Sequence, residues 1–139
     1  MVRKKAGPKA DKTDELAMAA VNAALDKKGL QPTLLDLADE GAYTDFILVV
    51  SGRSDRHVGS IADGIEKTLR DELGRMPLGV EGNRDGQWAL LDYGELVVHV
   101  FYHPLREFYD LEGLWSEAPR VPIDVPPDSQ LQYSDDYGA

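Results

Sequence analysis

A short stretch of small and polar residues, 51–54, has the composition of an anion-binding turn. It follows a β-favouring run at residues 46–50 and precedes a segment with helical periodicity, and helix N-termini in this setting attract anions. An enzyme that transfers nucleotides would also need carboxylates that converge on metal ions from fixed positions. The nearby predicted strands offer Asp92 alone, with Glu95 beyond a turn, and contain no Asp-x-Asp pair. We therefore interpret the turn as structural, and a nucleotidyltransferase-type enzyme that uses Ser51, Asp92 and Glu95 is the alternative hypothesis.

The histidines and the absence of cysteine limit the metal and redox chemistry of the chain. His99 and His103 are four residues apart, which on a helix would place two metal ligands on one face. Residues 87–102 are predicted to be extended, however, and four residues of strand span roughly 13 Å, too far for one ion. Without cysteine, disulfides, thiolate metal sites and a cysteine nucleophile are excluded, which fits a reducing cytoplasm. We predict no metal site and no cofactor.

Residues 87–102, QWALLDYGELVVHVFY, form the centre of the predicted sheet. Two apolar runs meet at residues 92–95, whose composition favours a tight hairpin turn. With Tyr93 and Gly94 in the turn, Trp88 would pair with His99. Because side chains alternate between faces, one face is aliphatic and predicted to pack under helices, and the other is aromatic and predicted to recognise a partner. The aliphatic face consists of Ala89, Leu91, Leu96, Val98 and Val100, and the aromatic face of Trp88, Leu90, Val97, His99 and Phe101.

Large aromatic residues crowd into the same part of the chain, around Arg106. Trp, Tyr and Arg often dominate the binding energy of protein interfaces. Trp88 and Tyr93 lie beside the hairpin turn, where a large ring is difficult to bury in a small domain, so both are predicted to contact a partner. Phe108 and Trp115 are predicted to anchor C-terminal helices on the sheet. The alternative interpretation is that helices cover both faces of the hairpin.

The remaining elements follow from periodicity and from residues that start or stop helices. Helices are predicted at residues 14–28, after a Thr13 N-cap, and from Ser54 to Gly74, with further helical turns from Pro104 onward. Strands are predicted at residues 34–37, 46–50 and 78–82, in addition to the two strands of the hairpin. This order predicts an α/β fold in which a mixed sheet of about five strands packs with helices in a single domain.

The length and composition also bound the domain organisation. The 139 residues suffice for one domain, and 42% hydrophobic with 29% charged residues is typical of a soluble globular protein. We expect a folded domain at residues 13–121, a disordered basic tail at 1–12 and a disordered, acidic, proline-rich tail at 122–139. No apolar run is long enough to span a bilayer and no secretory leader is predicted, so we expect a cytoplasmic protein.

The formal net charge of −10 narrows the choice of partner. Proteins that bind nucleic acids usually present a basic face, and this chain as a whole would be repelled by RNA. A basic protein partner would be favoured by charge complementarity. The alternative is that the net charge only keeps the protein soluble.

The hairpin also carries a family resemblance. The pattern W-x-L-L-D-Y-G-E-L-V-V-H-V-F at residues 88–101 resembles the central signature of the ribosomal silencing factors, the Iojap-related family. Further matches occur in the family's order at residues 44–46, 51–58, 60–63, 80–82, 106–112 and 114–115, so that the resemblance covers about residues 16–115. It implies a fold similar to that of the nucleotidyltransferases. The lysine-rich start and the acidic extension beyond Val121 depart from the family pattern.

The resemblance implies a binding protein without enzymatic activity. Family members bind large-subunit ribosomal protein L-fourteen, obstruct the joining of the small subunit and so repress translation when nutrients are scarce. A homodimer through the same face, as in a dimerisation or adaptor module, is an alternative. On the positions that match the family's motifs, the candidate partner contacts are Trp88, Leu90, Tyr93, His99, Phe101, Arg106 and Tyr109.

Overall fold

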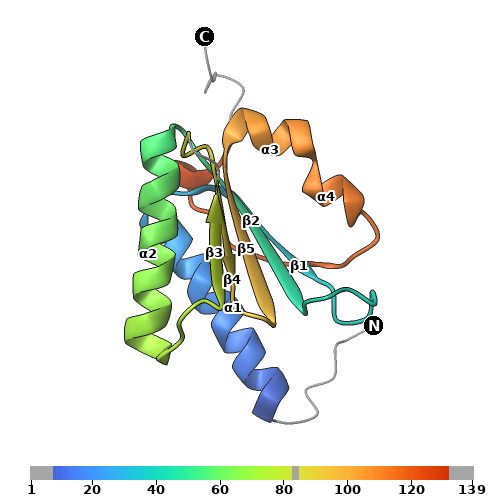
Figure 1. The fold of residues 1–139 in the computed structure, drawn as a ribbon. Coiled ribbons are helices and arrows are strands. Elements are labelled where there is room, and N and C mark those ends of the chain that lie inside the picture. The colour runs from blue at the N-terminus through green and yellow to red at the C-terminus, as the bar shows by residue number, and fades with distance from the viewer. Residues whose placement is uncertain (1–7, 83–84, 132–139) are drawn as a thin grey trace.

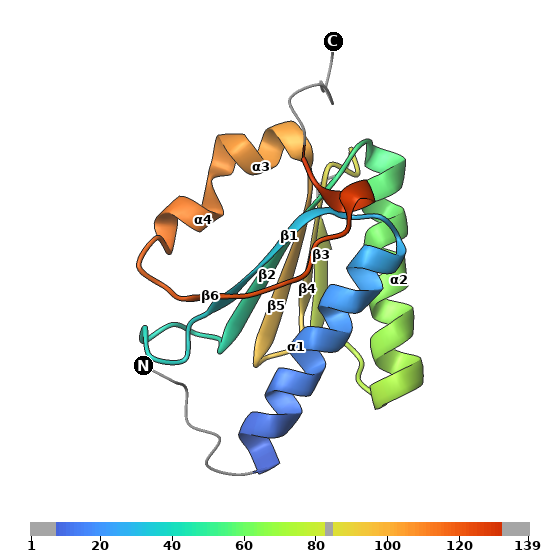
Figure 2. The same ribbon diagram turned by 180° about the vertical axis from the view of Figure 1, so that it is seen from behind.

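The structure is a computed structural model that describes residues 8–82 and 85–131. A mixed sheet lies between two layers of helices (Figure 1, Figure 2). Helices α1 (Pro8–Asp26) and α2 (Asp55–Leu73) cover one face, and α3 (His103–Tyr109) and α4 (Leu111–Leu114) lie over the other. The strands are β1 (Leu30–Asp36), β2 (Phe46–Gly52), β3 (Gly79–Gly82), β4 (Trp88–Asp92), β5 (Leu96–Tyr102) and β6 (Arg120–Val121).

The sheet has six strands in the order β3-β4-β5-β2-β1-β6. Strands β2 and β5 run parallel at its centre, and the other neighbours are antiparallel. This arrangement confirms the predicted mixed sheet packed with helices. The additional strand forms because Arg120 and Val121 pair with Leu35 and Leu34 of β1. Two residues are too few to show a strand periodicity, so the sequence does not reveal β6.

The β4–β5 hairpin has a different register from the predicted one. Trp88 pairs with Phe101, two residues beyond its predicted partner. The Tyr93 N–H donates to the carbonyl oxygen of Leu96 over 2.8 Å, so the turn is at residues 94 and 95 rather than 93 and 94. Gly94 has a φ of 89°, and tight hairpin turns favour glycine at this first central position. A shift of two residues leaves each side chain of the two strands on its predicted face.

Helix α2 forms where its caps and its apolar stripe predict it. At its start the Ser54 hydroxyl accepts a hydrogen bond from the His57 N–H (3.1 Å), and at its end Gly74 takes a left-handed conformation. Its apolar side packs with α1 on the aliphatic face of the hairpin, which is therefore the core, as predicted. Among the described residues, no helix is long and apolar enough to cross a bilayer. The hairpin residues that are fully buried on this face are Leu91, Leu96, Val98 and Val100.

The first helix and the first strand both start earlier than predicted. Helix α1 begins at Pro8, so Thr13 is not its N-cap and part of the predicted basic tail is helical. Proline is favourable at a first helical position because the N–H that it lacks would have no partner within the helix. Strand β1 begins at Leu30, and an irregularity in its pairing with β2 accommodates Pro32. Residues 1–7 lie outside the described residues.

The segment that follows β6 returns across the domain and contains a short 3-10 helix, η1 (Pro127–Ser129) (Figure 2). The Arg53 guanidinium donates to the carbonyl oxygen of Asp128 over 3.0 Å. The Leu131 N–H donates to Oε1 of Gln31 over 3.2 Å. Ile123 packs against the main core and Ser129 is 1% exposed. Residues 122–131 therefore pack on the domain, contrary to the prediction of a disordered tail, through contacts that composition does not reveal. Residues 132–139 lie outside the described residues.

Candidate functional site

Helices α3 and α4 cover much of the aromatic face of the hairpin, as the alternative interpretation expects: Val97, His99 and Phe101 are buried (2%, 9% and 4% exposed), and Val97 and Phe101 belong to a second apolar core. Trp88 and Leu90 are half-buried.

Four rings on this side of the sheet form a stacked row, with centroid distances of 6.3 Å from Trp88 to His99, 5.8 Å from His99 to Phe101 and 6.1 Å from Phe101 to Tyr109. Together with Leu111 they line a hollow of about 520 Å³, which we call the aromatic hollow. Its walls come from β4, β5, α3 and α4, so its shape depends on how the two short helices are held over the sheet.

Arg106 holds these helices in place. Its side chain donates to the Ser51 hydroxyl (3.1 Å), to the Thr33 hydroxyl (3.0 Å) and twice to the Glu112 carboxylate (2.9 and 3.1 Å). Burial of Glu112 opposes its ionisation, but the hydrogen bonds and charge of Arg106 outweigh this effect and lower the pKa of Glu112. Arg106 is only 5% exposed. Its burial disagrees with the prediction of a direct partner contact, and it positions the aromatic hollow instead.

The predicted anion-binding turn belongs to the same polar network. Ser51 is fully buried, and its hydroxyl lies 2.8 Å from Nδ1 of His103. Burial lowers the pKa of His103. A Cβ atom on Gly52 would lie only 2.9 Å from the backbone nitrogen of Val58, so α2 packs directly against the turn. These contacts give the turn a structural role.

The acidic residues of the enzyme alternative lie away from this turn. Asp92 and Ser51 pair with residues of β5 that are four positions apart, a separation of roughly 13 Å along the strand. The Glu95 carboxylate binds the Arg75 guanidinium through two contacts of 2.9 Å. In the described part of the chain, no three His, Asp or Glu side chains are close enough together to hold a metal ion. The geometry that a two-metal enzyme requires is therefore not found among these residues.

His99 lies in the middle of the aromatic row and is 9% exposed. Its Nδ1 accepts a hydrogen bond from Nε1 of Trp88 over 3.2 Å. Its Nε2 has no hydrogen-bond partner among the described residues. Burial lowers the pKa of His99 to about 4, so the ring is neutral near pH 7. The aromatic hollow thus combines apolar walls with one neutral, polar ring.

The predicted contacts Trp88, Leu90, Phe101 and Tyr109 lie on this side of the sheet. Trp88 and Leu90 are half-buried, whereas Phe101 is only 4% exposed, as buried as Arg106, and forms a wall of the aromatic hollow from within the second apolar core. Tyr109 stands at its rim and is 62% exposed. Alternation along the hairpin predicts that Trp88, Leu90 and Phe101 share a face with His99, and the structure confirms it. Tyr109 joins them from helix α3, which alternation does not predict.

Tyr93 is a correction to the predicted contacts. It is 1% exposed and packs in the core beneath the helices α1 and α2. With the turn at residues 94 and 95, Tyr93 extends β4 and continues the aliphatic face on which Leu91 lies. Burial raises the pKa of Tyr93 to about 12. The expectation that this ring stays exposed beside the turn is therefore wrong.

Helices α3 and α4 follow the predictions in part. Trp115 packs on the apolar cluster beneath these helices, as predicted. Phe108 is 78% exposed, so it does not anchor α3, and its ring meets Tyr109 edge-on at a centroid distance of 5.2 Å. Leu111 lines the aromatic hollow but was not predicted to do so. A single leucine in a four-residue helix has no periodicity that would have indicated it.

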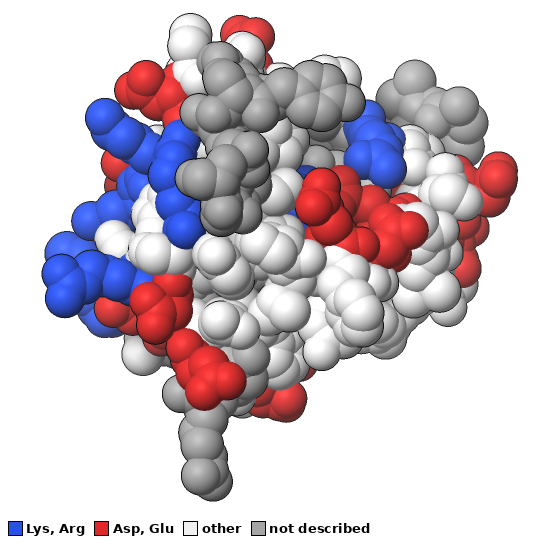
Figure 3. All heavy atoms as spheres, turned by 90° about the horizontal axis from the view of Figure 1, so that it is seen from above, with Lys and Arg blue, Asp and Glu red and all other residues white. Residues whose placement is uncertain are grey.

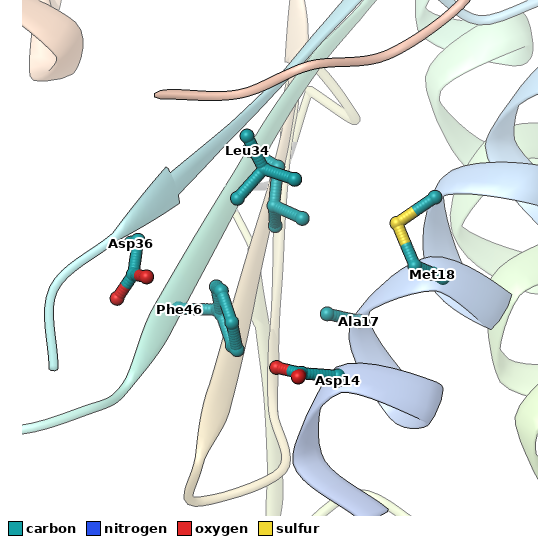
Figure 4. Close-up of a pocket in the computed structure, with 7 residues that line it drawn as sticks. Asp14, Ala17, Met18, Leu34, Asp36 and Phe46 are labelled. Carbon is teal, nitrogen blue, oxygen red and sulfur yellow. The ribbon is translucent and has the colours of Figure 1, made fainter. Parts of the chain in front are cut away.

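A second hollow, of about 310 Å³, lies between α1 and the strands β1 and β2 (Figure 4). Its walls include Leu34, Phe46 and Met18, and the Asp14 side chain extends from α1 toward Phe46. Asp36, at the end of β1, accepts a hydrogen bond from the N–H of a residue two positions later (3.0 Å). This hollow has a single aromatic wall and no stacked row of rings.

Charge is distributed unevenly over the surface. Figure 3 shows Lys and Arg gathered on the α2 side of the molecule. Lys27, Arg56 and Lys67 line a polar hollow between α1 and α2, together with Asp26 and Asp63. No charged residue of the described chain lines the aromatic hollow. Contacts made in the aromatic hollow therefore depend on apolar surface and individual hydrogen bonds.

The sequence matches a family model described as "Ribosomal silencing factor during starvation" over residues 10–137. The "Ribosomal silencing factor RsfS" of Halalkalibacterium halodurans is 37% identical over 113 residues, which cover 79% of this chain and 93% of the relative. That of Bacillus subtilis is 37% identical over 105 residues, which cover 76% and 88%. The "Protein Iojap, chloroplastic" of Zea mays is 29% identical over 90 residues, which cover 65% and 38%.

Solved structures show the same fold. A crystal structure of a protein from Chromobacterium violaceum superposes with a TM-score of 0.71 at 31% identity, covering 84% of this chain and 97% of that one. A crystal structure from Bacillus halodurans superposes with a TM-score of 0.68 at 37% identity, covering 79% and 99%. The family model and the curated relatives carry the name of the family that the pattern at residues 88–101 resembles. The chain therefore belongs to the ribosomal silencing factor family.

Proposed function

We propose that this protein binds the large ribosomal subunit through ribosomal protein L-fourteen and so blocks joining of the small subunit, which represses translation when nutrients are limited. A mouse relative, 29% identical over 85 residues that cover 60% of this chain and 37% of the relative, is named "Mitochondrial assembly of ribosomal large subunit protein 1". That name supports the large subunit as the partner. The mechanism is steric and has no catalytic step, and it places the protein in the cytoplasm with the ribosomes.

The observation that carries the proposal is the aromatic hollow. Half-buried Trp88 and exposed Tyr109 present aromatic surface there, backed by the buried rings of His99 and Phe101, and Trp and Tyr are among the residues that most often dominate interface energies. Exposed Phe108 and Leu114 (78% and 72%) extend the apolar surface along α3 and α4. The net charge of −10 supports a basic partner, because complementary charge speeds the encounter and disfavours wrong partners.

The test is a subunit-joining assay. Purified protein is added to separated ribosomal subunits, and their reassociation is followed by light scattering and gradient sedimentation. We expect the wild-type protein to slow reassociation and to sediment with large subunits. Trp88→Ala should weaken binding by about 2 kcal/mol, or roughly 30-fold in Kd, because it removes a wall of the aromatic hollow.

The matched control is Met18→Ala. Met18 is also a partly exposed apolar side chain (37%), but it lies on α1 at the opposite face of the sheet. We expect this variant to bind like the wild type. Urea denaturation of both variants separates loss of binding from loss of folding. Equal effects of the two substitutions, or normal reassociation in the presence of the wild-type protein, would contradict the proposal.

The same assay also addresses the homodimer alternative. Two copies that each carry a net charge of −10 repel one another, which opposes self-association through this face. Sedimentation of the protein alone gives its oligomeric state. A dimer that Trp88→Ala dissociates, together with no effect on subunits, would make self-association the function of the aromatic hollow.

A further inference from the structure

The hydrogen bond between Trp88 and His99 determines which nitrogen of the imidazole carries the proton. The indole Nε1 of Trp88 is a donor only, so His99 Nδ1 must be the acceptor over their 3.2 Å contact. The ring is neutral near pH 7, and a neutral imidazole has one N–H. The proton is therefore on Nε2, and His99 presents a donor there.

This donor is buried without a partner. His99 Nε2 accepts nothing and donates to nothing among the described residues, although the side chain is 91% buried in an apolar environment. An unsatisfied buried donor destabilises a folded protein, and the ring cannot turn away because it stacks between Trp88 and Phe101. The free energy lost in this way is recovered if a ligand supplies an acceptor.

From this arrangement we propose that His99 Nε2–H donates to a neutral oxygen of the protein partner, a main-chain or side-chain amide carbonyl that enters the aromatic hollow beside an apolar side chain. A carboxylate would be buried there without a compensating cation, and an ammonium group would have no acceptor, because no charged residue of the described chain lines the aromatic hollow. Tyr109, at the rim, is the most exposed of the four rings that line the aromatic hollow (62%). The proposal rests on the proposed function and specifies the chemistry of its contact.

The first test measures the tautomer directly. Imidazole ¹⁵N–¹H NMR of the full chain should show His99 protonated on Nε2 in the free protein. On addition of purified ribosomal protein L-fourteen, the Nε2–H resonance should move downfield and its exchange with water should slow. A proton on Nδ1 in the free protein would overturn the inference whatever the partner, and an unchanged Nε2–H in a saturated complex would overturn it as well.

The second test separates the donor from the ring. His99→Phe keeps a stacked ring and removes the N–H, and we expect at least tenfold weaker binding to L-fourteen and to large subunits. His99→Gln loses the ring but can place an amide N–H close to the position of Nε2, and we expect it to bind more tightly than His99→Phe. The reverse order would show that only ring packing matters and would overturn the inference.

The wild-type protein distinguishes failure of this inference from failure of the proposed function. If it binds neither L-fourteen nor large subunits, the proposed function fails and the inference about its partner fails with it. If it binds and His99→Phe binds equally well, the proposed function stands and only the donor role of His99 is refuted. Urea denaturation confirms that each variant is folded at the temperature of the assay.

Discussion

Replacement of His99 by phenylalanine should make the stability of this protein less sensitive to acid. Burial lowers the pKa of His99 from 6.5 to about 4. In the unfolded chain the ring binds a proton as the pH falls through its ordinary pKa, whereas in the folded protein it stays neutral until the pH reaches about 4. Protonation therefore favours the unfolded state between these values. The contribution of the neutral His99 ring to the free energy of unfolding is fully present above pH 6.5, and it is lost progressively as the pH falls toward 4.

The magnitude follows from the size of the pKa shift. One pKa unit corresponds to about 1.4 kcal/mol. Between pH 7.5 and pH 5, proton uptake by His99 in the unfolded chain lowers the free energy of unfolding by about 2 kcal/mol. Phenylalanine has no titrating group, so His99→Phe should lack this loss while it keeps the stacking with Trp88 and Phe101. The other two histidines are present in both proteins, and their effects cancel in the comparison.

The assay is urea unfolding of the wild-type protein and of His99→Phe at pH 7.5 and at pH 5. The lower pH stays above the range in which carboxylates such as Glu112, with its lowered pKa, become protonated in the folded protein. We expect the wild-type protein to lose about 2 kcal/mol more than the variant over this interval. If the two proteins lose the same stability, His99 is not a buried neutral ring and the reasoning is refuted.

Three further predictions concern the core, the polar network and the C-terminal segment. Leu91→Ala should lower the free energy of unfolding, measured in urea, by about 2–5 kcal/mol because it leaves a cavity beneath α2. Loss of binding with full stability would show that this residue lies on the binding face. Glu112→Gln should destabilise the protein by about 2 kcal/mol, because Arg106 would keep its charge without a carboxylate; calorimetry would refute this if the melting temperature did not change. Truncation after residue 121 should lower the melting temperature more than truncation after residue 131, since only the first removes the contacts with Arg53 and Gln31; equal melting temperatures would mean that residues 122–131 add no stability.

The faces of the hairpin could be predicted from the sequence although its turn could not. Alternation has a period of two, so a register error of two residues changes every cross-strand partner and leaves every side chain on its own face. The position of the turn depends on which residue takes a positive φ. Gly94 does so at the first central position, whereas the prediction placed it second. Because the predicted turn was one residue too early, it contained Tyr93, and this side chain was therefore expected to be exposed.

The ends of the chain were difficult to predict for another reason. Composition indicates whether a segment can form a core of its own, and residues 122–131 cannot. They are ordered by contacts with parts of the domain that lie far away in the sequence: Ile123 packs against the main core, and the segment accepts a hydrogen bond from Arg53 and donates one to Gln31. Such contacts form only when the rest of the domain is folded, and no pattern in the neighbouring sequence predicts them.

Two groups of residues determine the aromatic hollow: those that line it and those that hold the helices α3 and α4 in place around it. Arg106 fits the residue types of an interface, and from sequence alone it cannot be told apart from a contact residue such as Trp88. In the structure its hydrogen bonds to Ser51, Thr33 and Glu112 determine where α3 and α4 lie, and no Arg106 atom needs to touch a partner. A substitution of Arg106 should therefore weaken binding only by displacing the helices. In a protein whose helices α3 and α4 are already displaced, a substitution of Trp88 removes less of the binding surface than it does in the wild-type protein. The two substitutions together should then cost less binding free energy than the sum of the two alone, whereas two independent contact residues would give the full sum.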